Sequence, residues 1–254
     1  MTLLACESLG RRFDGIVALH ELTFDLPEGG LTAIIGPNGA GKTTLFNLLC
    51  GVIPPSAGSI RFRGRDVTGW PSHRVAALGI ARTFQNLELF GDMTVLDNVR
   101  VGQHAHLGSG VVEALLRVGR HRADERRATG RARDVLERLG LGDYAAWPAS
   151  ALPYGLQRRV ELARAVAADP VLLMLDEPLA GLGGREADEV GRLVRDVAEE
   201  GPTVLFIEHH VESVMAISDR VLVFNFGELI ADGPPDAVQR DPVVIEAYLG
   251  EDVA

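Results

Sequence analysis

GPNGAGKTT, at residues 36–44, is the most informative segment of this 254-residue chain. It contains the pattern G-x-x-x-x-G-K-T, which binds phosphate when a strand precedes it and a helix follows it. The apolar run 31–35 predicts a short buried strand, and residues 42–50 predict a helix with one apolar face. Both neighbours are present, so the sequence predicts a phosphate-binding P-loop. Its residues are Gly36, Pro37, Asn38, Gly39, Ala40, Gly41, Lys42, Thr43 and Thr44.

The residue types of this loop suit phosphate chemistry. Glycines let the backbone curl around a phosphate, so that successive N–H groups and the start of the helix point at it. Lys42 is expected to reach the β- and γ-phosphates as a compact charge, and the Thr43 hydroxyl to ligate Mg²⁺. Lys42 is the only lysine in a chain with 25 lysines and arginines together, so arginine has replaced lysine everywhere else. The loop alone leaves kinase, GTPase and ATPase open.

Composition excludes several classes of protein. Hydrophobic residues make up 46% of the chain, as expected for a globular protein. The net charge of −10 argues against a general nucleic-acid binder, which needs a positive surface. The two cysteines, Cys6 and Cys50, favour a reducing compartment over a disulfide framework. No apolar run has the length of a membrane span, and the N-terminus lacks the order of a signal peptide, so we expect an intracellular protein.

Two further apolar runs end in polar residues. The run 170–178 closes on Asp176 and Glu177, and the run 203–207 is followed by Glu208, His209 and His210. Strands of a parallel sheet present their carboxyl ends at one edge, where open α/β sheets place their sites. We therefore expect Asp176 to hold Mg²⁺ through water and Glu177 to act as the base for an attacking water.

The set of motifs resembles an ATP-binding-cassette (ABC) ATPase over essentially the whole chain. A helix predicted within 152–168, followed by Asp176 at the family's spacing, carries this resemblance together with the P-loop. It implies an α/β P-loop NTPase fold with a parallel core sheet, an antiparallel β subdomain and a helical subdomain. We expect one domain with two lobes, a core of about 1–85 and 160–254 and a helical lobe of about 86–159.

The resemblance also assigns individual residues. Phe13 lies where the family places an aromatic ring that stacks on adenine, although a plain core aromatic is the alternative. Gln85 lies where the family places the glutamine that links the metal and the attacking water to the membrane partner. His209 matches the histidine that contacts the γ-phosphate. The implied cofactors are ATP and Mg²⁺, with Thr43, Gln85 and Asp176 around the metal and Glu177, His209 and Gln85 in catalysis.

Three long stretches narrow the resemblance to the branched-chain amino acid importer family, and to the larger of its two ATPase subunits. They are ARTFQNLELFGDMTVLDNVRVGQHAH, LPYGLQRRVELARA and FGELIADGPPDAVQRDPVVIEAYLG. The implied partners are a second ABC ATPase subunit, two integral membrane permease subunits and, indirectly, a periplasmic or extracellular substrate-binding protein. No nucleic-acid partner is implied. The implied location is peripheral, on the cytoplasmic side of the inner membrane.

The signature loop departs from the family pattern Leu-Ser-Gly-Gly-Gln. It consists here of Leu152, Pro153, Tyr154, Gly155, Leu156 and Gln157. In an ABC dimer this loop closes over the ATP held by the partner, and Pro153 offers neither a hydroxyl nor an N–H. Gly183 also replaces a usual Asp. We expect a heterodimer in which the site on this chain's P-loop is competent and the opposite site is weaker. A homodimer, or two working sites that rely on the Gly155 N–H, stays open.

Alternatives from other classes make different predictions. A soluble ABC ATPase of the Fe–S-assembly type would have similar size and motifs but soluble partners. A P-loop kinase would leave the signature segment and His209 unexplained.

The segment 117–138 carries eight arginines against four acidic residues. It favours a solvated helix with i,i+4 ion pairs, and a face toward anionic lipid is the second interpretation.

Overall fold

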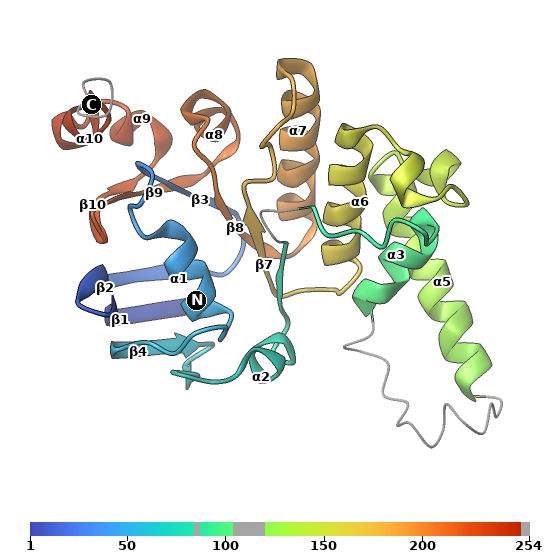
Figure 1. The fold of residues 1–254 in the computed structure, drawn as a ribbon, viewed down its shortest axis with the longest axis horizontal. Helices are drawn as coiled ribbons and strands as arrows, with labels where there is room; N and C mark the ends of the chain where they lie inside the picture. Colours follow the sequence, from blue (N-terminus) through green and yellow to red (C-terminus); the bar gives the residue numbers. More distant parts are fainter. Residues whose placement is uncertain (84–86, 104–119, 250–254) are drawn as a thin grey trace. The chain divides into compact units, whose positions relative to one another are not determined.

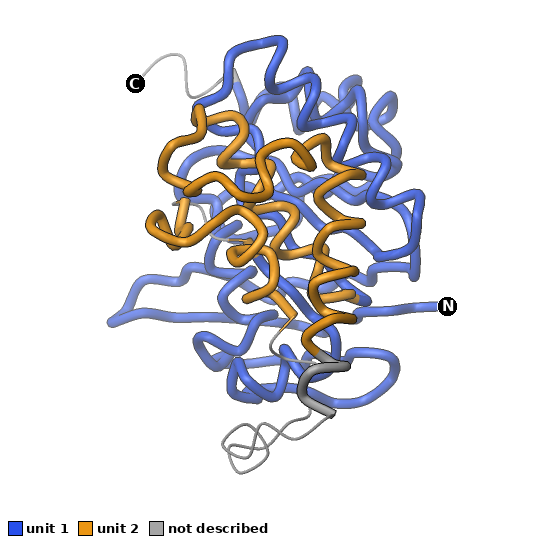
Figure 2. The backbone as a smooth tube through the Cα atoms, turned by 90° about the vertical axis from the view of Figure 1, so that its right-hand side faces the viewer, with its two compact units in different colours: residues 1–82, 171–254 blue, residues 83–170 orange. Residues whose placement is uncertain are grey.

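The computed structural model describes residues 1–83, 87–103 and 120–249. The chain divides into two compact units, residues 1–82 with 171–254 and residues 83–170 (Figure 2). Each unit has its own secondary structure and is described separately below. None of the helices in the described ranges is both long and apolar enough to cross a bilayer.

The first unit is built on a six-stranded sheet with the order β10-β9-β3-β8-β7-β6 (Figure 1). Its parallel strands are β3 (Leu31–Ile35), β6 (Ile80–Arg82), β7 (Leu172–Asp176), β8 (Thr203–Ile207) and β9 (Arg220–Asn225). Every residue of β3, β7 and β8 is buried, as expected for parallel strands covered on both faces. The edge strand β10 (Glu228–Gly233) is antiparallel, because a tight turn folds it straight back onto β9.

A four-stranded antiparallel sheet forms the other layer of this unit. Its order is β2-β1-β4-β5, from β1 (Thr2–Phe13), β2 (Ile16–Pro27), β4 (Ala57–Phe62) and β5 (Arg65–Asp66). Helix α1 (Lys42–Leu49) buries Phe46 and three leucines in one core that also contains side chains of both sheets (Figure 1). The P-loop that precedes α1 is thereby anchored between the layers. The antiparallel β subdomain that the family resemblance implies is thereby confirmed.

Five further helices lie in the described part of the first unit. They are α2 (Ser72–Ala76), α7 (Gly184–Glu200), α8 (Val211–Ile217), α9 (Pro235–Val238) and α10 (Pro242–Leu249). Helix α7 follows β7 and turns Val190, Val194 and Val197 inward, at the spacing expected of an amphipathic helix.

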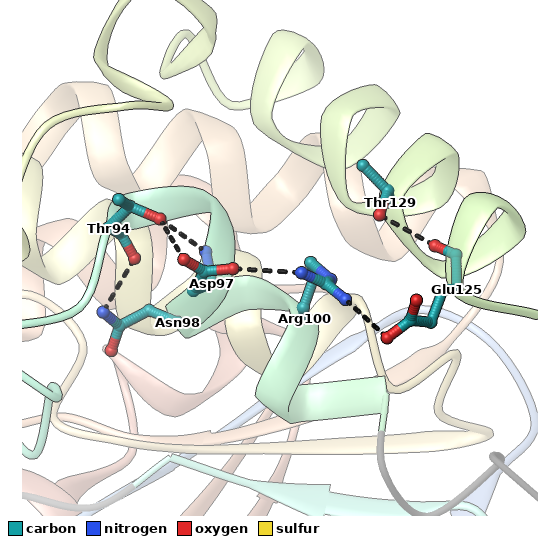
Figure 3. A network of polar contacts seen from close by, with 6 residues as sticks. All are labelled: Thr94, Asp97, Asn98, Arg100, Glu125 and Thr129. Atoms are coloured by element: carbon teal, nitrogen blue, oxygen red, sulfur yellow. Dashed lines mark hydrogen bonds and ion pairs between the residues drawn. The ribbon is translucent and has the colours of Figure 1, made fainter. Parts of the chain in front are cut away.

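The second unit is helical in the part that the structure describes. It contains α3 (Val95–Gly102), α5 (Arg120–Arg138), α6 (Tyr154–Val166) and short 3-10 turns at Gly142–Tyr144 and Ala149–Ala151. Thr94 caps α3 by accepting a hydrogen bond from the Asp97 N–H, an arrangement that favours the start of a helix. Figure 3 shows that Asp97 also forms an ion pair with Arg100, whose guanidinium forms a second ion pair with Glu125 of α5.

Helix α5 carries much of the arginine-rich segment. Ala128, Ala132, Val135 and Leu136 are buried. The arginines whose side chains are described lie on the exposed side of the helix, at Arg126, Arg127, Arg131, Arg133 and Arg138. This pattern fits a solvated helix face, and contact with lipid stays a prediction.

Candidate functional site

The P-loop requires glycine at two of its positions. Gly36 has φ +147°, and a Cβ there would overlap the carbonyl oxygen of Phe224. Gly41 has φ +96°, and its Cβ would lie 2.6 Å from the carbonyl oxygen of Ala18. Only glycine adopts this backbone without strain at such close approach. The turn therefore joins β3 directly to α1, and the N-terminus of that helix supplies a partial positive charge to the loop.

Lys42 is folded into this loop. Its side chain is buried, and the Nζ donates hydrogen bonds to the carbonyl oxygens of Gly36 and Pro37, the latter at 2.8 Å. Thr43, next along the helix, is exposed. The ammonium is thus held inside the curl of the loop, where a phosphate group of a nucleotide would be cradled.

Strand register brings the acidic residues to the same edge of the sheet. Ile34 of β3 and Asp176 of β7 both pair with Ile207 of β8, so the three parallel strands end level with one another. The P-loop, Glu177 and Glu208 each follow one of these strand ends. The convergence that the sequence predicted for the apolar runs is therefore present in this unit.

Asp176 and Thr43, which the family resemblance assigns to magnesium, have side chains of the type that magnesium prefers. Both offer oxygen atoms, and Mg²⁺ is typically held by one or two protein ligands, water and substrate phosphates. The side chain of Asp176 is only 1% exposed, and its Oδ2 accepts a hydrogen bond from Arg82 at 2.7 Å. Burial raises the pKa of Asp176, and the guanidinium of Arg82 opposes that shift. Within the described residues, no group of three or more His, Cys, Asp or Glu side chains is arranged to hold a metal. The hydroxyl of Thr43 and the carboxylate of Asp176 are donors that fit a magnesium ion whose other ligands are water and substrate phosphates.

Glu177 has an unusual backbone. Its φ is +50°, in the left-handed region that non-glycine residues rarely adopt, and its N–H donates to the carbonyl oxygen of Ile207. The turn places the carboxylate 3.6 Å from Nδ1 of His209. The Glu177 side chain is 17% exposed and that of His209 is 49% exposed, so water can reach both.

Glu208 connects two turns at this edge, a contact that the sequence did not indicate. Its side chain is fully buried, and its two carboxylate oxygens accept from different segments. Oε1 accepts from the N–H of Leu179 at 2.8 Å, and Oε2 accepts from the N–H of His209 at 3.1 Å. The carboxylate therefore fastens the turn that carries Glu177 to the turn that carries His209. No local pattern reveals this, because the two turns are remote in sequence.

We expect Glu208→Gln to lower the ATP turnover number at least about tenfold while changing the apparent ATP affinity less than about twofold. An amide can accept from one of the two N–H groups, but its own NH₂ opposes the other. Phosphate release by the assembled complex measures the effect, and Glu212→Gln, an exposed change nearby, is the control. Unchanged turnover in a folded Glu208→Gln variant would contradict this positioning function.

The same variant changes the pH dependence of stability. Desolvation raises the pKa of Glu208 above its ordinary value of 4.5, although backbone N–H groups oppose the shift. A raised carboxyl pKa contributes stability at low pH that is lost as pH rises through the raised value. The melting temperature of the parent chain, relative to Glu208→Gln, should therefore fall as pH rises above 4.5. If the melting temperature of the parent chain instead rose relative to that of Glu208→Gln over this pH range, the predicted sign would be wrong.

Phe13 and Gln85 are the two remaining residues that the family resemblance assigns to the nucleotide or the metal. Phe13 ends β1 and is 39% exposed, with the Arg11 guanidinium 4.5 Å from its ring centroid. It is therefore a partly exposed ring on the first unit, not a core aromatic. Gln85 lies outside the described residues.

The signature loop lies in the second unit, at the start of α6. Pro153 and Tyr154 are exposed, whereas Leu152 and Gly155 are buried. The Gln157 side chain donates to the Leu152 carbonyl oxygen at 2.8 Å and thereby closes the loop on itself. Pro153 occupies the N-cap position of α6 without a side-chain cap, as its chemistry requires.

Comparison with known proteins identifies close relatives. Residues 19–180 match the family model described as ABC transporter, and residues 228–254 match that described as branched-chain amino acid ATP-binding cassette transporter. The high-affinity branched-chain amino acid transport ATP-binding protein LivG of Salmonella typhimurium is 44% identical over 98% of both chains. The corresponding protein BraF of Pseudomonas aeruginosa is 42% identical over 98% of both chains.

A solved structure agrees with these sequence matches. The ADP conformation of an ATP-binding cassette of an ABC transporter superimposes with a TM-score of 0.85 at 30% identity. The match covers 98% of this chain and 99% of the other. The arrangement of sheets and helices described above is thus that of a nucleotide-binding cassette.

Proposed function

This chain belongs to the ABC transporter family as one of its ATP-binding, ATP-hydrolysing subunits, and we propose that the importer it energises carries branched-chain amino acids. The observation that supports this substrate class is the match of residues 228–254 to the branched-chain amino acid cassette model. Relatives named as branched-chain transport proteins match over 98% of their length, which supports the same assignment. They give no support to the alternative of a soluble assembly ATPase.

Nucleotide is held in this proposal by the P-loop. When nucleotide binds, the Lys42 ammonium exchanges its hydrogen bonds to the carbonyl oxygens of Gly36 and Pro37 for contacts with the β- and γ-phosphates. Backbone N–H groups of residues 36–44 donate further hydrogen bonds to the phosphates. Thr43 and Asp176 hold Mg²⁺ with the nucleotide, and Gln85 is assigned near it by the family pattern. The metal, when bound, neutralises phosphate charge and so supports attack on the γ-phosphate. Phe13 offers its exposed ring to adenine.

Hydrolysis in this proposal uses the two turns that Glu208 connects. Glu177 accepts the proton of the attacking water, for which a half-buried carboxylate beside the phosphate is suited. His209, 3.6 Å from Glu177, donates to the γ-phosphate oxygens and fixes the carboxylate's orientation. The strained backbone of Glu177 directs its side chain to one position, which reduces the reorganisation needed at reaction.

Transport requires partners that this chain does not supply. We assign it a second ABC ATPase subunit, two integral membrane permease subunits and, indirectly, a substrate-binding protein outside the membrane. The ATP substrate places the chain at the cytoplasmic face as a peripheral subunit. Its signature loop, from Leu152 to Gln157, faces the partner's ATP in the dimer. Pro153 weakens that site, since it provides neither the hydroxyl nor the N–H of the family pattern.

Affinity purification of the tagged chain from its native cells in mild detergent tests this proposal. We expect two multi-span membrane proteins and a second ABC ATPase to be recovered and identified by mass spectrometry. The signature loop of that second ATPase then shows which of the two composite sites has complete ligands. Recovery of soluble partners alone would retain the ATPase chemistry and remove the transport function.

A further inference from the structure

Arg82 forms a buried ion pair with the residue assigned to the metal. It ends strand β6, next to β7 in the sheet, and its side chain is 9% exposed. One guanidinium nitrogen donates to Oδ2 of Asp176 at 2.7 Å, and that carboxylate is 1% exposed. A full positive charge therefore already lies against the carboxylate that the proposed function assigns to Mg²⁺.

The same guanidinium reaches the helix that follows the P-loop. Its second terminal nitrogen donates to Oδ1 of Asn47 at 2.7 Å, and it lies 5.5 Å from the ring centroid of Phe46. Burial raises the pKa of the Cys50 thiol to about 11, and the charge of Arg82 opposes that shift. Asn47 and Phe46 both belong to α1, which begins with Lys42 and Thr43. Arg82 thus connects the phosphate-binding helix to the metal-binding strand.

The positive charge of Arg82 affects how Asp176 can bind a metal ion. A buried carboxylate needs a compensating charge, and Arg82 provides it inside the protein when no metal ion is bound. A divalent cation that approaches without nucleotide meets a carboxylate already neutralised and is repelled by the guanidinium. A nucleotide brings negative phosphates that offset the charge of Arg82 and supply most of the metal's oxygen ligands.

We propose that Arg82 is the internal counterion of Asp176 and prevents divalent cations from binding the site without nucleotide. Arg82 is a positioning residue in this inference, because it acts through Asp176 and α1. The inference rests on the proposed function only for the assignment of Asp176 to the metal. The ion pair between Arg82 and Asp176 makes the metal and the nucleotide bind together, so that the metal does not occupy the site alone.

Manganese binding to the nucleotide-free chain tests this inference, with Mn²⁺ as a spectroscopic stand-in for Mg²⁺. Arg82→Met removes the charge and keeps an apolar stem, and Arg192→Met, an exposed change on α7, is the matched control. We expect Arg82→Met to bind free Mn²⁺ about tenfold more tightly than the parent, by electron paramagnetic resonance titration. Adding Asp176→Asn to Arg82→Met should abolish that gain. Equal Mn²⁺ affinity in the parent and Arg82→Met would overturn the inference.

A second variant keeps the test decisive if Arg82→Met folds poorly. Arg82→Lys retains the charge but cannot span both Asp176 and Asn47, so its Mn²⁺ affinity should stay within about twofold of the parent. A tenfold gain in Arg82→Lys would contradict a charge-based mechanism. Nucleotide binding by the parent is measured separately: its loss would count against the proposed function, whereas equal Mn²⁺ affinities with intact nucleotide binding would count against Arg82 alone.

Discussion

Glu177→Gln is expected to lower ATP turnover of the assembled transporter by about two to four orders of magnitude, the range typical of a lost general base. The amide has nearly the shape of the carboxylate but cannot accept the proton of the attacking water. Nucleotide binding should persist, because the P-loop and Lys42 are unchanged. Phosphate release under saturating ATP, alongside equilibrium nucleotide binding, measures both quantities.

The matched control for this variant is Glu186→Gln. Glu186 lies in the first turn of α7 and is exposed, so its replacement should leave turnover unchanged. A folded Glu177→Gln transporter with nearly normal turnover would show that another group removes the proton.

The same experiment tests the asymmetry of the dimer. If Pro153 weakens the site over the partner's ATP, nearly all turnover depends on Glu177 of this chain. A transporter that retains more than half of its turnover with Glu177→Gln would refute the asymmetry, because the opposite site would then hydrolyse ATP well. The partner's own catalytic carboxylate, changed in parallel, should have the smaller effect.

Lys42→Ala is expected to weaken nucleotide binding by about 10- to 100-fold, as the loss of charge-assisted hydrogen bonds to phosphate predicts. The substitution also removes the hydrogen bonds to the Gly36 and Pro37 carbonyl oxygens. Thermal unfolding therefore has to accompany the binding titration, so that loss of the ligand contact is separated from loss of the fold.

Lys42→Arg is the more informative companion of that variant. Arginine keeps the charge, and this chain uses it at every other basic position apart from histidine. A planar guanidinium does not fit the buried space between two loop carbonyl oxygens, so we expect binding to remain about tenfold weaker. Full binding by Lys42→Arg would show that charge alone suffices and that the single lysine has no special function.

The parts of the fold that local sequence determines could be predicted. The apolar run 31–35 predicted the strand now described as β3, and the segment 42–50 after the P-loop predicted helix α1. These features depend on neighbours within a few residues, where residue type fixes backbone geometry. The carboxyl-terminal edge could be anticipated because each buried run ended in polar residues.

Long-range pairs could not be predicted in the same way. Arg82 meets Asp176 only because β6 lies beside β7, and Glu208 reaches Leu179 only because β8 lies on the other side. Strand order sets both contacts, and no spacing in the sequence encodes it. The left-handed backbone of Glu177 is similarly imposed by the surrounding turn and not by its residue type.

The most direct measurement is uptake of labelled leucine by proteoliposomes that contain the complex copurified with this chain, with ATP enclosed and the substrate-binding protein added outside. We expect uptake that requires ATP and falls to background with Glu177→Gln in this chain, with Glu186→Gln retaining full uptake. ATP hydrolysis by the same complex without uptake of leucine, isoleucine or valine would contradict the assignment to branched-chain amino acids.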